Sequence, residues 1–432
     1  MIHRTINGLP DDLYRTTPAN YNVSGYFYTP VISDNPCSFL YRSVGYYPDP
    51  DNKVNQDSEP DEFQFNFLGK QGTFIIPKNS SFTGGPVKVL TKPQSNLDVQ
   101  LYQTAMPFGI KTDLGKIVIT DDNGIQYWFT ELQTTIKKKS KVISDSSKFI
   151  PNIGTEKFYH YEYDLVFDYY VTDWALTKII DLNSKEEINL EYEYFFAQIK
   201  SPEVLTSYIS SSTRDYYWDD KNMLKGDQKR LKSISFSNGD KVNFEYSTQS
   251  RCDSIWDKAL QKIRIKNNSG NEIEYGLNYV YYKGNTEINF DACVSQTEDE
   301  SLSKWLFLKS ITKNASSSSI KIAEFDYIRS SDKIAPNTPA NSSHVRKNVR
   351  YQDFFGYYKG SPVKNCYDPN GVNGICLTTP LAGYSEIGSL KKIIYPTGGS
   401  STFEYEGNSI VENGAEKPFY GVRIKRSLKM MV

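Results

Sequence analysis

Histidine is the side chain most often used as a general base near neutral pH. This chain of 432 residues has three: His3, His160 and His344. His160 lies in the segment YHYEYD, where it could act as a base paired with Asp164 or stand in a row of surface side chains on a strand. The sequence has no Gly-x-Ser-x-Gly, His-Glu-x-x-His, Cys-x-x-Cys or phosphate-binding glycine loop. We therefore expect no catalytic residue, no cofactor and no enzymatic activity.

Clustered carboxylates could bind calcium, which requires several oxygen ligands. The acidic stretch that would supply them contains Asp49, Asp51, Asp57, Glu59, Asp61 and Glu62. Its spacing does not match an EF-hand loop, and Asp368-Pro369-Asn370-Gly371 reproduces only part of one. Solvated turns explain both segments, so we expect no metal site.

The five cysteines are too few and too scattered for a disulfide framework. Cys366 and Cys376 flank a turn-rich loop and could form a disulfide in an oxidising compartment. The alternative is that all five cysteines are free or buried thiols.

An aromatic cluster in RDYYWDD is the candidate ligand-contact loop. Tyr216, Tyr217 and Trp218 could stack on sugars, or they could anchor the loop on the rest of the fold.

A repeated sequence pattern predicts the strands that would position these residues. Leucine, two residues and isoleucine are followed by a polar turn and an alternating strand that ends in tyrosine. The copies begin at Leu176, Leu231, Leu260, Leu308 and Leu390 and close at Tyr192, Tyr246, Tyr275, Tyr327 and Tyr405. Alternation with period 2 indicates half-buried antiparallel strands, and Asn238-Gly239 or Gly398-Gly399 suits a tight hairpin turn. The repeat predicts an array of β-hairpins.

The Leu-x-x-Ile step breaks that alternation, because residues three apart on a strand point to opposite faces. We interpret the step as a repeated β-bulge or strand entry. The fourth copy has a further phase slip that a bulge near Ala323 would reconcile.

Composition supports an all-β fold, with 33 tyrosines and 23 phenylalanines. We expect an array of antiparallel hairpins forming an extended sheet spiral or partial shell. Residues 1–62 should form an irregular proline-rich segment and 63–172 a region of β-hairpins. Residues 173–432 should form the repeat array, with loop insertions near 198–226 and 330–388; residues 134–154 also resemble a long loop.

These units resemble the tyrosine/aspartate (YD) repeats of the Rhs family of large bacterial surface and secreted proteins. The segment LKKIIYPTGGSSTFEYE (390–406) is the best match, with Gly398-Gly399 at the turn and Phe403, Glu404 and Tyr405 at the strand close. LEYE, FEYS and FDYI are variants of that close, and DSEPDEFQFNF (57–67) and DFFGYYKG (353–360) are similar to other family segments. The resemblance covers about residues 57–432. Tyrosine is seldom followed by aspartate here, so the copies are degenerate, and the carboxy-terminal self-cleaving core motif is missing.

The resemblance implies an exported, non-enzymatic structural scaffold, part of a shell, fibre or surface display protein at the cell surface or secreted. The alternative from another class is a surface adhesin that binds glycan or protein through the insertion loops, and a third is a secreted hydrolase.

A signal peptide and an 18-residue apolar run are missing from the sequence. We therefore expect no transmembrane helix, and a piece of a longer surface protein. A net charge of -1 argues against nucleic acid as a partner, which leaves an unknown protein cargo, a surface partner or a glycan.

Overall fold

The fold is that of a computed structural model. It describes residues 1–5, 14–16, 22–24, 54–56, 60–77, 86–93, 96–104, 114–150, 154–200, 204–210, 213–219, 223–254, 257–283, 286–294, 303–315, 318–329, 384–412 and 414–430. Two compact units divide the chain. Unit 1 contains Met1–Lys141, Tyr163–Ile199 and Met223–Lys241, and unit 2 contains Val142–Glu162, Lys200–Asn222 and Val242–Val432. The limits of these two units do not coincide with the predicted segment boundaries after residues 62 and 172.

Every regular element among the described residues is a strand. The strands of unit 1 are β1 (Ile2–Thr5), β2 (Tyr14–Thr16), β3 (Asn22–Ser24), β4 (Val54–Gln56), β5 (Glu62–Phe67), β6 (Lys70–Ile75), β7 (Val87–Lys88), β8 (Leu90–Lys92), β9 (Asp98–Gln103) and β10 (Leu114–Thr120), with most of β11 (Ile125–Ile150), β12 (Gly154–Asp181), β13 (Glu187–Lys200) and β16 (Met223–Phe236). Within the region 63–172, where β-hairpins are predicted, β5 pairs with β6 and β10 pairs with β11 as antiparallel hairpins.

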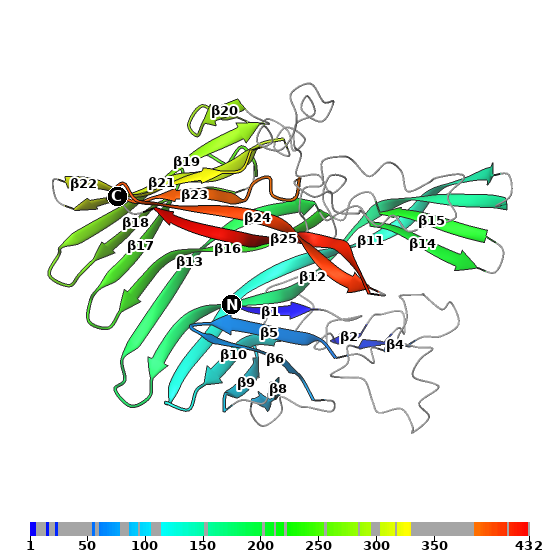
Figure 1. The fold of residues 1–432 in the computed structure, drawn as a ribbon. Coiled ribbons are helices and arrows are strands. Elements are labelled where there is room, and N and C mark those ends of the chain that lie inside the picture. Colours follow the sequence, from blue (N-terminus) through cyan, green and yellow to red (C-terminus); the bar gives the residue numbers. More distant parts are fainter. Residues whose placement is uncertain are drawn as a thin grey trace. The chain divides into compact units, whose positions relative to one another are not determined.

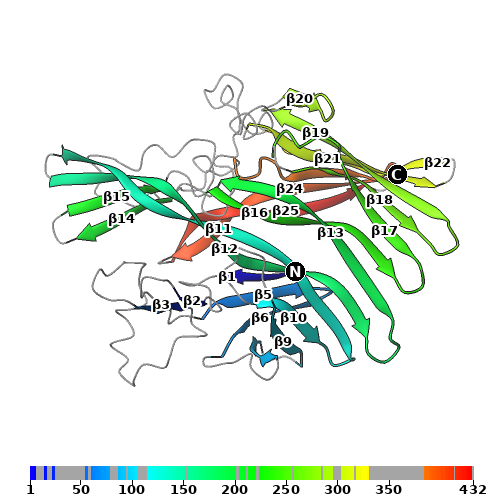
Figure 2. The same cartoon turned by 180° about the vertical axis from the view of Figure 1, so that it is seen from behind.

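Unit 1 is a two-layer sheet structure in which both layers share β12. One layer runs from β12 through β1, β5 and β6 to β8, and the other from β12 through β11, β10 and β9 to β7. β7 and β8 are consecutive in the chain, and they pair with β9 and β6, respectively, at the ends of the two layers. Both views show β5, β6, β9 and β10 gathered together (Figure 1, Figure 2).

The core of unit 1 is aromatic and lies between these layers. Phe63, Phe65 and Phe67 alternate with polar residues on β5, so all three point inward. The ring of Phe67 lies 4.8 Å from that of Tyr127 and 5.2 Å from that of Phe129 on the opposite layer. Such tilted and edge-on pairs add stabilisation beyond the burial of apolar area.

The predicted irregular segment 1–62 begins instead with a central strand. β1 pairs with β5 on one edge and with β12 on the other. Ile2 and Arg4 point into the core, and Arg4 Nε donates to Asp61 Oδ2 at 2.7 Å with both side chains fully buried. Four residues are too short a pattern to reveal a strand whose partners lie far away in the sequence.

Unit 2 consists mainly of consecutive antiparallel hairpins. Its strands are β14 (Val204–Ser210), β15 (Thr213–Asp219), β17 (Lys241–Tyr246), β18 (Leu260–Lys266), β19 (Glu272–Lys283), β20 (Thr286–Asn289), β21 (Trp305–Ala315), β22 (Ser318–Tyr327), β23 (Leu390–Ile394), β24 (Ser400–Glu412) and β25 (Ala415–Met430). Figure 2 shows the hairpins from β17 to β22 beside one another. The predicted all-β array of antiparallel hairpins in an extended sheet is confirmed.

Turns in both units repeat one geometry. Gly124, Gly239, Gly270 and Gly398 have positive φ and donate their N–H to the carbonyl three residues earlier. A side chain would be strained in that backbone conformation, so the glycine fixes where each hairpin turns. The turn residues predicted at Gly239 and Gly398 are confirmed, and Gly270 forms the same kind of turn.

The predicted bulges are present in two copies of the Leu-x-x-Ile step. Tyr279 faces Leu308 while Asn278 faces Ser310, so Lys309 is an extra residue. Lys391 is an extra residue after Leu390 in the same way. A similar bulge in β22 skips Ile322, next to Ala323, and confirms the phase slip of the fourth copy.

Two predicted loops are strands. The insertion near 198–226 holds the hairpin β14–β15, and residues 134–154 belong to β11 and the start of β12. Lysine and serine favour loops only weakly, and pairing with neighbouring strands outweighed their preference. Of the insertion 330–388, residues 330–383 lie outside the described residues.

The ends of that second insertion are hydrogen-bonded to each other. Ile328 N donates to Ser389 O and Gly388 N donates to Ile328 O, both at 2.9 Å. β22 then pairs directly with β23, so the array continues as if the insertion were not there. No helix in the described part of the chain is long and apolar enough to cross a membrane.

Candidate functional site

In four copies of the repeat, a tyrosine hydroxyl donates to a leucine carbonyl. The distances are 2.7 Å from Tyr192 Oη to Leu176 O, 2.7 Å from Tyr279 to Leu260, 3.0 Å from Tyr327 to Leu308 and 2.8 Å from Tyr405 to Leu390. We call these contacts the tyrosine–leucine bonds. At Leu308 and Leu390 a bulge disrupts the ladder, and there the phenol supplies a donor to the carbonyl.

In the third copy, the tyrosine that makes this contact is not the one that we predicted. Tyr275 was expected to end the repeat, but it is the Tyr279 hydroxyl that donates a hydrogen bond to Leu260 O. Tyr279 also faces Leu308 of the next copy across the sheet. Likewise, Tyr327 donates to Leu308 O and faces Leu390 of the next copy. Spacing alone could not select Tyr279, because the chain offers a tyrosine at both positions.

The environment keeps these phenols protonated, as a donor must be. Burial raises the pKa of all four above its usual value, and that of Tyr192 and Tyr279 to about 12. For Tyr192 the charge of Glu131 adds to the effect. The repeated tyrosines are thus hydrogen-bond donors within the fold rather than acids or nucleophiles.

Removing one hydroxyl should measurably destabilise the array. Tyr327→Phe keeps the ring that packs 4.5 Å from Phe307 but leaves the Leu308 carbonyl without its phenol donor. We expect a loss of about 1–2 kcal/mol in the free energy of unfolding, measured in urea. Tyr194→Phe is the matched control, because that side chain is 67% exposed, and its effect should stay within about 0.5 kcal/mol. Equal losses in the two variants would contradict a role for the tyrosine–leucine bond.

Alkaline solution should weaken the fold through the same side chains. The folded chain holds the phenolic protons of Tyr192, Tyr279 and Tyr281 up to a pKa of about 12, whereas unfolded tyrosines release theirs near 10. The folded state therefore binds more protons between these pH values, and stability must fall as pH rises through this window. Urea midpoints should decline from about pH 10 upward. Tyr192→Phe should show a shallower decline, and an unchanged slope in that variant would refute the assignment.

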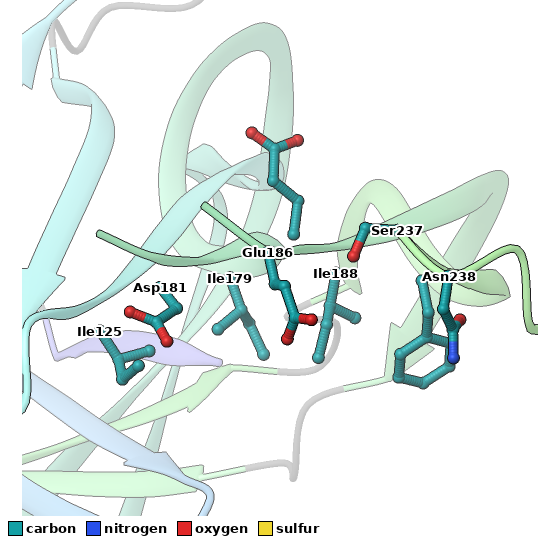
Figure 3. A pocket seen from close by; sticks show the side chains of 9 residues that line it. Ile125, Ile179, Asp181, Glu186, Ile188, Ser237 and Asn238 are labelled. Atoms are coloured by element: carbon teal, nitrogen blue, oxygen red, sulfur yellow. The ribbon is translucent and has the colours of Figure 1, made fainter. Parts of the chain in front are cut away.

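A groove of about 320 Å3 lies in unit 1 at the turn ends of its hairpins. Ile125, Ile179 and Ile188 extend to one side of it, near the carboxylates of Asp181 and Glu186 (Figure 3). The neighbouring turns are joined by backbone bonds, from Leu182 N to Gly124 O at 3.2 Å and from Ser237 N to Glu187 O at 3.0 Å.

Most acidic side chains of the groove already serve the fold. Asp181 accepts from Asn183 N at 2.8 Å and from the Ser184 hydroxyl at 2.9 Å, and these bonds lower its pKa. Glu187 forms an ion pair with Lys178 at 2.8 Å. Among the residues that the structure describes, no group of histidine, cysteine or acidic side chains is arranged to hold a metal ion. Of the proposed calcium ligands, Asp61 is instead the partner of Arg4.

The predicted aromatic ligand loop is a strand with two hydrogen-bonded neighbours. Tyr216, Tyr217 and Trp218 lie on β15, where they face Ser207, Thr206 and Leu205 of β14 on one edge. On the other edge they face Phe158, Tyr159 and His160 of β12, which runs parallel. Their side chains and that of His160 lie outside the described residues, so their predicted roles stay predictions.

The structure contains a disulfide that the sequence did not reveal. Cys252 and Cys293 are bonded, with their Cα atoms 5.9 Å apart. Both are buried beside Tyr281, whose ring stacks on Phe290 and whose hydroxyl accepts from Cys252 N at 3.1 Å. The prediction that all five cysteines are unpaired is wrong for these two. Cys366 and Cys376 lie outside the described residues, and their pairing remains a prediction.

The described side chains thus form hydrogen bonds, ion pairs and a disulfide that serve the sheet. No known protein-family model matches the sequence, and no curated protein is measurably similar to it.

Proposed function

We propose that this chain is a non-enzymatic, exported structural β-scaffold of Rhs/YD-repeat type that forms part of a shell, fibre or surface display protein. The observation that carries the proposal is the tyrosine–leucine bond, which recurs at equivalent positions in four copies. The residues that repeat are the ones that hold strands and bulges together. Selection for a repeated binding site would instead preserve exposed side chains.

Consecutive hairpins support the same proposal energetically. A single hairpin is marginal in water, whereas neighbouring hairpins share ladders and bury each other's faces. Cross-strand charge pairs follow the pattern, as where Arg264 reaches Glu245, Glu272 and Glu274 of adjacent strands at 2.8–3.0 Å. Exposed pairs of this kind contribute little to stability singly but favour one register.

Export is supported by the disulfide between Cys252 and Cys293. Structural disulfides persist in oxidising compartments and are rare in the reducing cytosol. The bond closes a loop with a sequence separation of 41 residues, which contains β18, β19 and β20.

Thiol trapping in cells that produce the chain tests the proposal. Free thiols are blocked with an alkylating reagent before lysis, and the peptides are then identified by mass spectrometry. We expect Cys252 and Cys293 to be recovered as a linked pair. We also expect to find the protein on the surface of intact cells or in their medium. A fully alkylated pair in a protein confined to the cytosol would overturn export, and with it the scaffold proposal in this form.

A further inference from the structure

The outer face of three strands in unit 1 has the side chains of a binding surface. Along β9, β10 and β11, Val99, Leu101, Ile117, Ile119, Tyr127 and Phe129 face the core, and the residues between them face outward. Gln100, Tyr102, Lys116, Gln126 and Trp128 are all partly exposed there, and we call them the outer aromatic face. Because neighbouring strands hold them in register, their spacing is fixed by the sheet.

Lys116 lies between the two aromatic rings of this face. Its Nζ is 3.5 Å from the centroid of the Trp128 ring and 4.9 Å from that of Tyr102. Cation–π attraction holds the ammonium there. Within the described part of the chain no carboxylate forms an ion pair with Lys116, and burial lowers the pKa of its amine. This positive charge is thus left for a ligand to neutralise.

Nearby, Lys178 makes a useful contrast. Its Nζ is 5.8 Å from the centroid of the same Trp128 ring, but it is paired with Glu187 at 2.8 Å. Among the described residues, Lys178 has an acidic partner and Lys116 has none.

The polar groups of the outer aromatic face are fixed in place before any ligand arrives. The Tyr102 hydroxyl donates to Gln100 Oε1 at 2.8 Å, and Trp128 Nε1 donates to Gln126 Oε1 at 3.2 Å. The Gln100 amide also donates to Asp98 Oδ2, and the Gln126 amide donates to the Thr120 hydroxyl at 3.4 Å. These bonds orient both amides, and each amide retains one N–H and a carbonyl lone pair that hydroxyl groups can use. Binding would then cost little side-chain entropy.

We infer that the outer aromatic face binds a sugar that carries a carboxylate, as a residue of an acidic polysaccharide. The ligand carboxylate pairs with Lys116, the C–H faces of the pyranose ring pack against Tyr102 and Trp128, and its hydroxyls bond to Gln100 and Gln126. A neutral sugar would leave the charge of Lys116 unmatched, and an acidic peptide would not use the paired amides and rings together. This inference does not depend on the proposed scaffold function, because a structural protein and a soluble one could both use such a face.

Titration calorimetry on the full chain tests the inference, with oligogalacturonate as the acidic sugar, a neutral glucan of similar length and poly-glutamate. We expect saturable binding of oligogalacturonate alone, weakened by added salt. Lys116→Gln and Tyr102→Ala should each weaken it about tenfold or more. Lys309→Gln, which removes an exposed lysine of unit 2 that is paired with Glu287, should leave it unchanged.

Trp128→Phe is a fourth variant, which retains a ring at the position opposite the buried Val118 and should show an intermediate affinity. Circular dichroism and the melting temperature establish that each variant is folded. Undetectable binding of oligogalacturonate, equal binding of poly-glutamate, or full affinity in folded Lys116→Gln would each overturn the inference.

Discussion

Asp61→Ala is expected to destabilise the protein by about 3–5 kcal/mol, because it leaves the Arg4 guanidinium buried without its counter-charge. Neither side chain of this pair has any solvent exposure. The guanidinium also contacts the carbonyl of Val171 at 3.4 Å and the ring of Phe63 at 5.3 Å, but neither group carries the negative charge of a carboxylate. The urea dependence of intrinsic fluorescence measures the loss, since Trp174 lies in the same core.

Two further variants separate charge burial from simple loss of contact. Asp173→Ala removes the partner of His3, which is 54% exposed, and should cost less than about 1 kcal/mol. Replacing both core partners, as Arg4→Met with Asp61→Leu, should be less harmful than Asp61→Ala alone, because no unpaired charge remains. A double variant as unstable as the single one would show that packing, and not charge, dominates at this position.

Removing the disulfide should have an effect of similar size on unit 2. The bond closes a loop with a sequence separation of 41 residues, and the chain-entropy relation gives about 4 kcal/mol for a loop of that length. Cys252→Ser with Cys293→Ser should therefore lower the free energy of unfolding by about 3–4 kcal/mol. The hairpin β18–β19 should also become more accessible to protease.

Reduction of the unaltered protein is the control for that experiment. A mild thiol should lower the stability of the unaltered protein at least as much as the double substitution does. Any further loss that the thiol causes in the doubly substituted chain would come from another disulfide, such as the predicted one between Cys366 and Cys376. Cys366→Ser with Cys376→Ser, measured beside it, tests the pairing predicted from sequence. Stability that is unaffected when Cys252 and Cys293 are replaced would refute a structural role for their bond.

Much of the hairpin array could be predicted because its signals are local. The turn glycines, the alternation on β5 and the bulge next to Ala323 each involve residues close together in the sequence. Steric and pleating rules act over such distances, and they apply without knowledge of the rest of the chain.

What could not be predicted depends on residues far apart in the sequence. β1 is a strand because β5 and β12 flank it, and Arg4 tolerates burial only because Asp61 arrives 57 residues later. The partner of Cys252 was one of four other cysteines, and nothing local distinguished it. The outer aromatic face was missed for the same reason, since Tyr102, Lys116 and Trp128 become neighbours only when β9, β10 and β11 pair.

The hydrogen bonds that join Ile328 to Gly388 and Ser389 have a consequence for how this chain can change over evolution or by design. They tie together the two ends of the long insertion, so β22 meets β23 whatever lies between them. A foreign domain grafted there need only have termini close together, whereas the tyrosine–leucine bonds span separations of 15 to 19 residues. Large changes of length are thus accommodated at the insertion and only small ones within a repeat, which makes the interval 330–383 the natural site for grafting a domain.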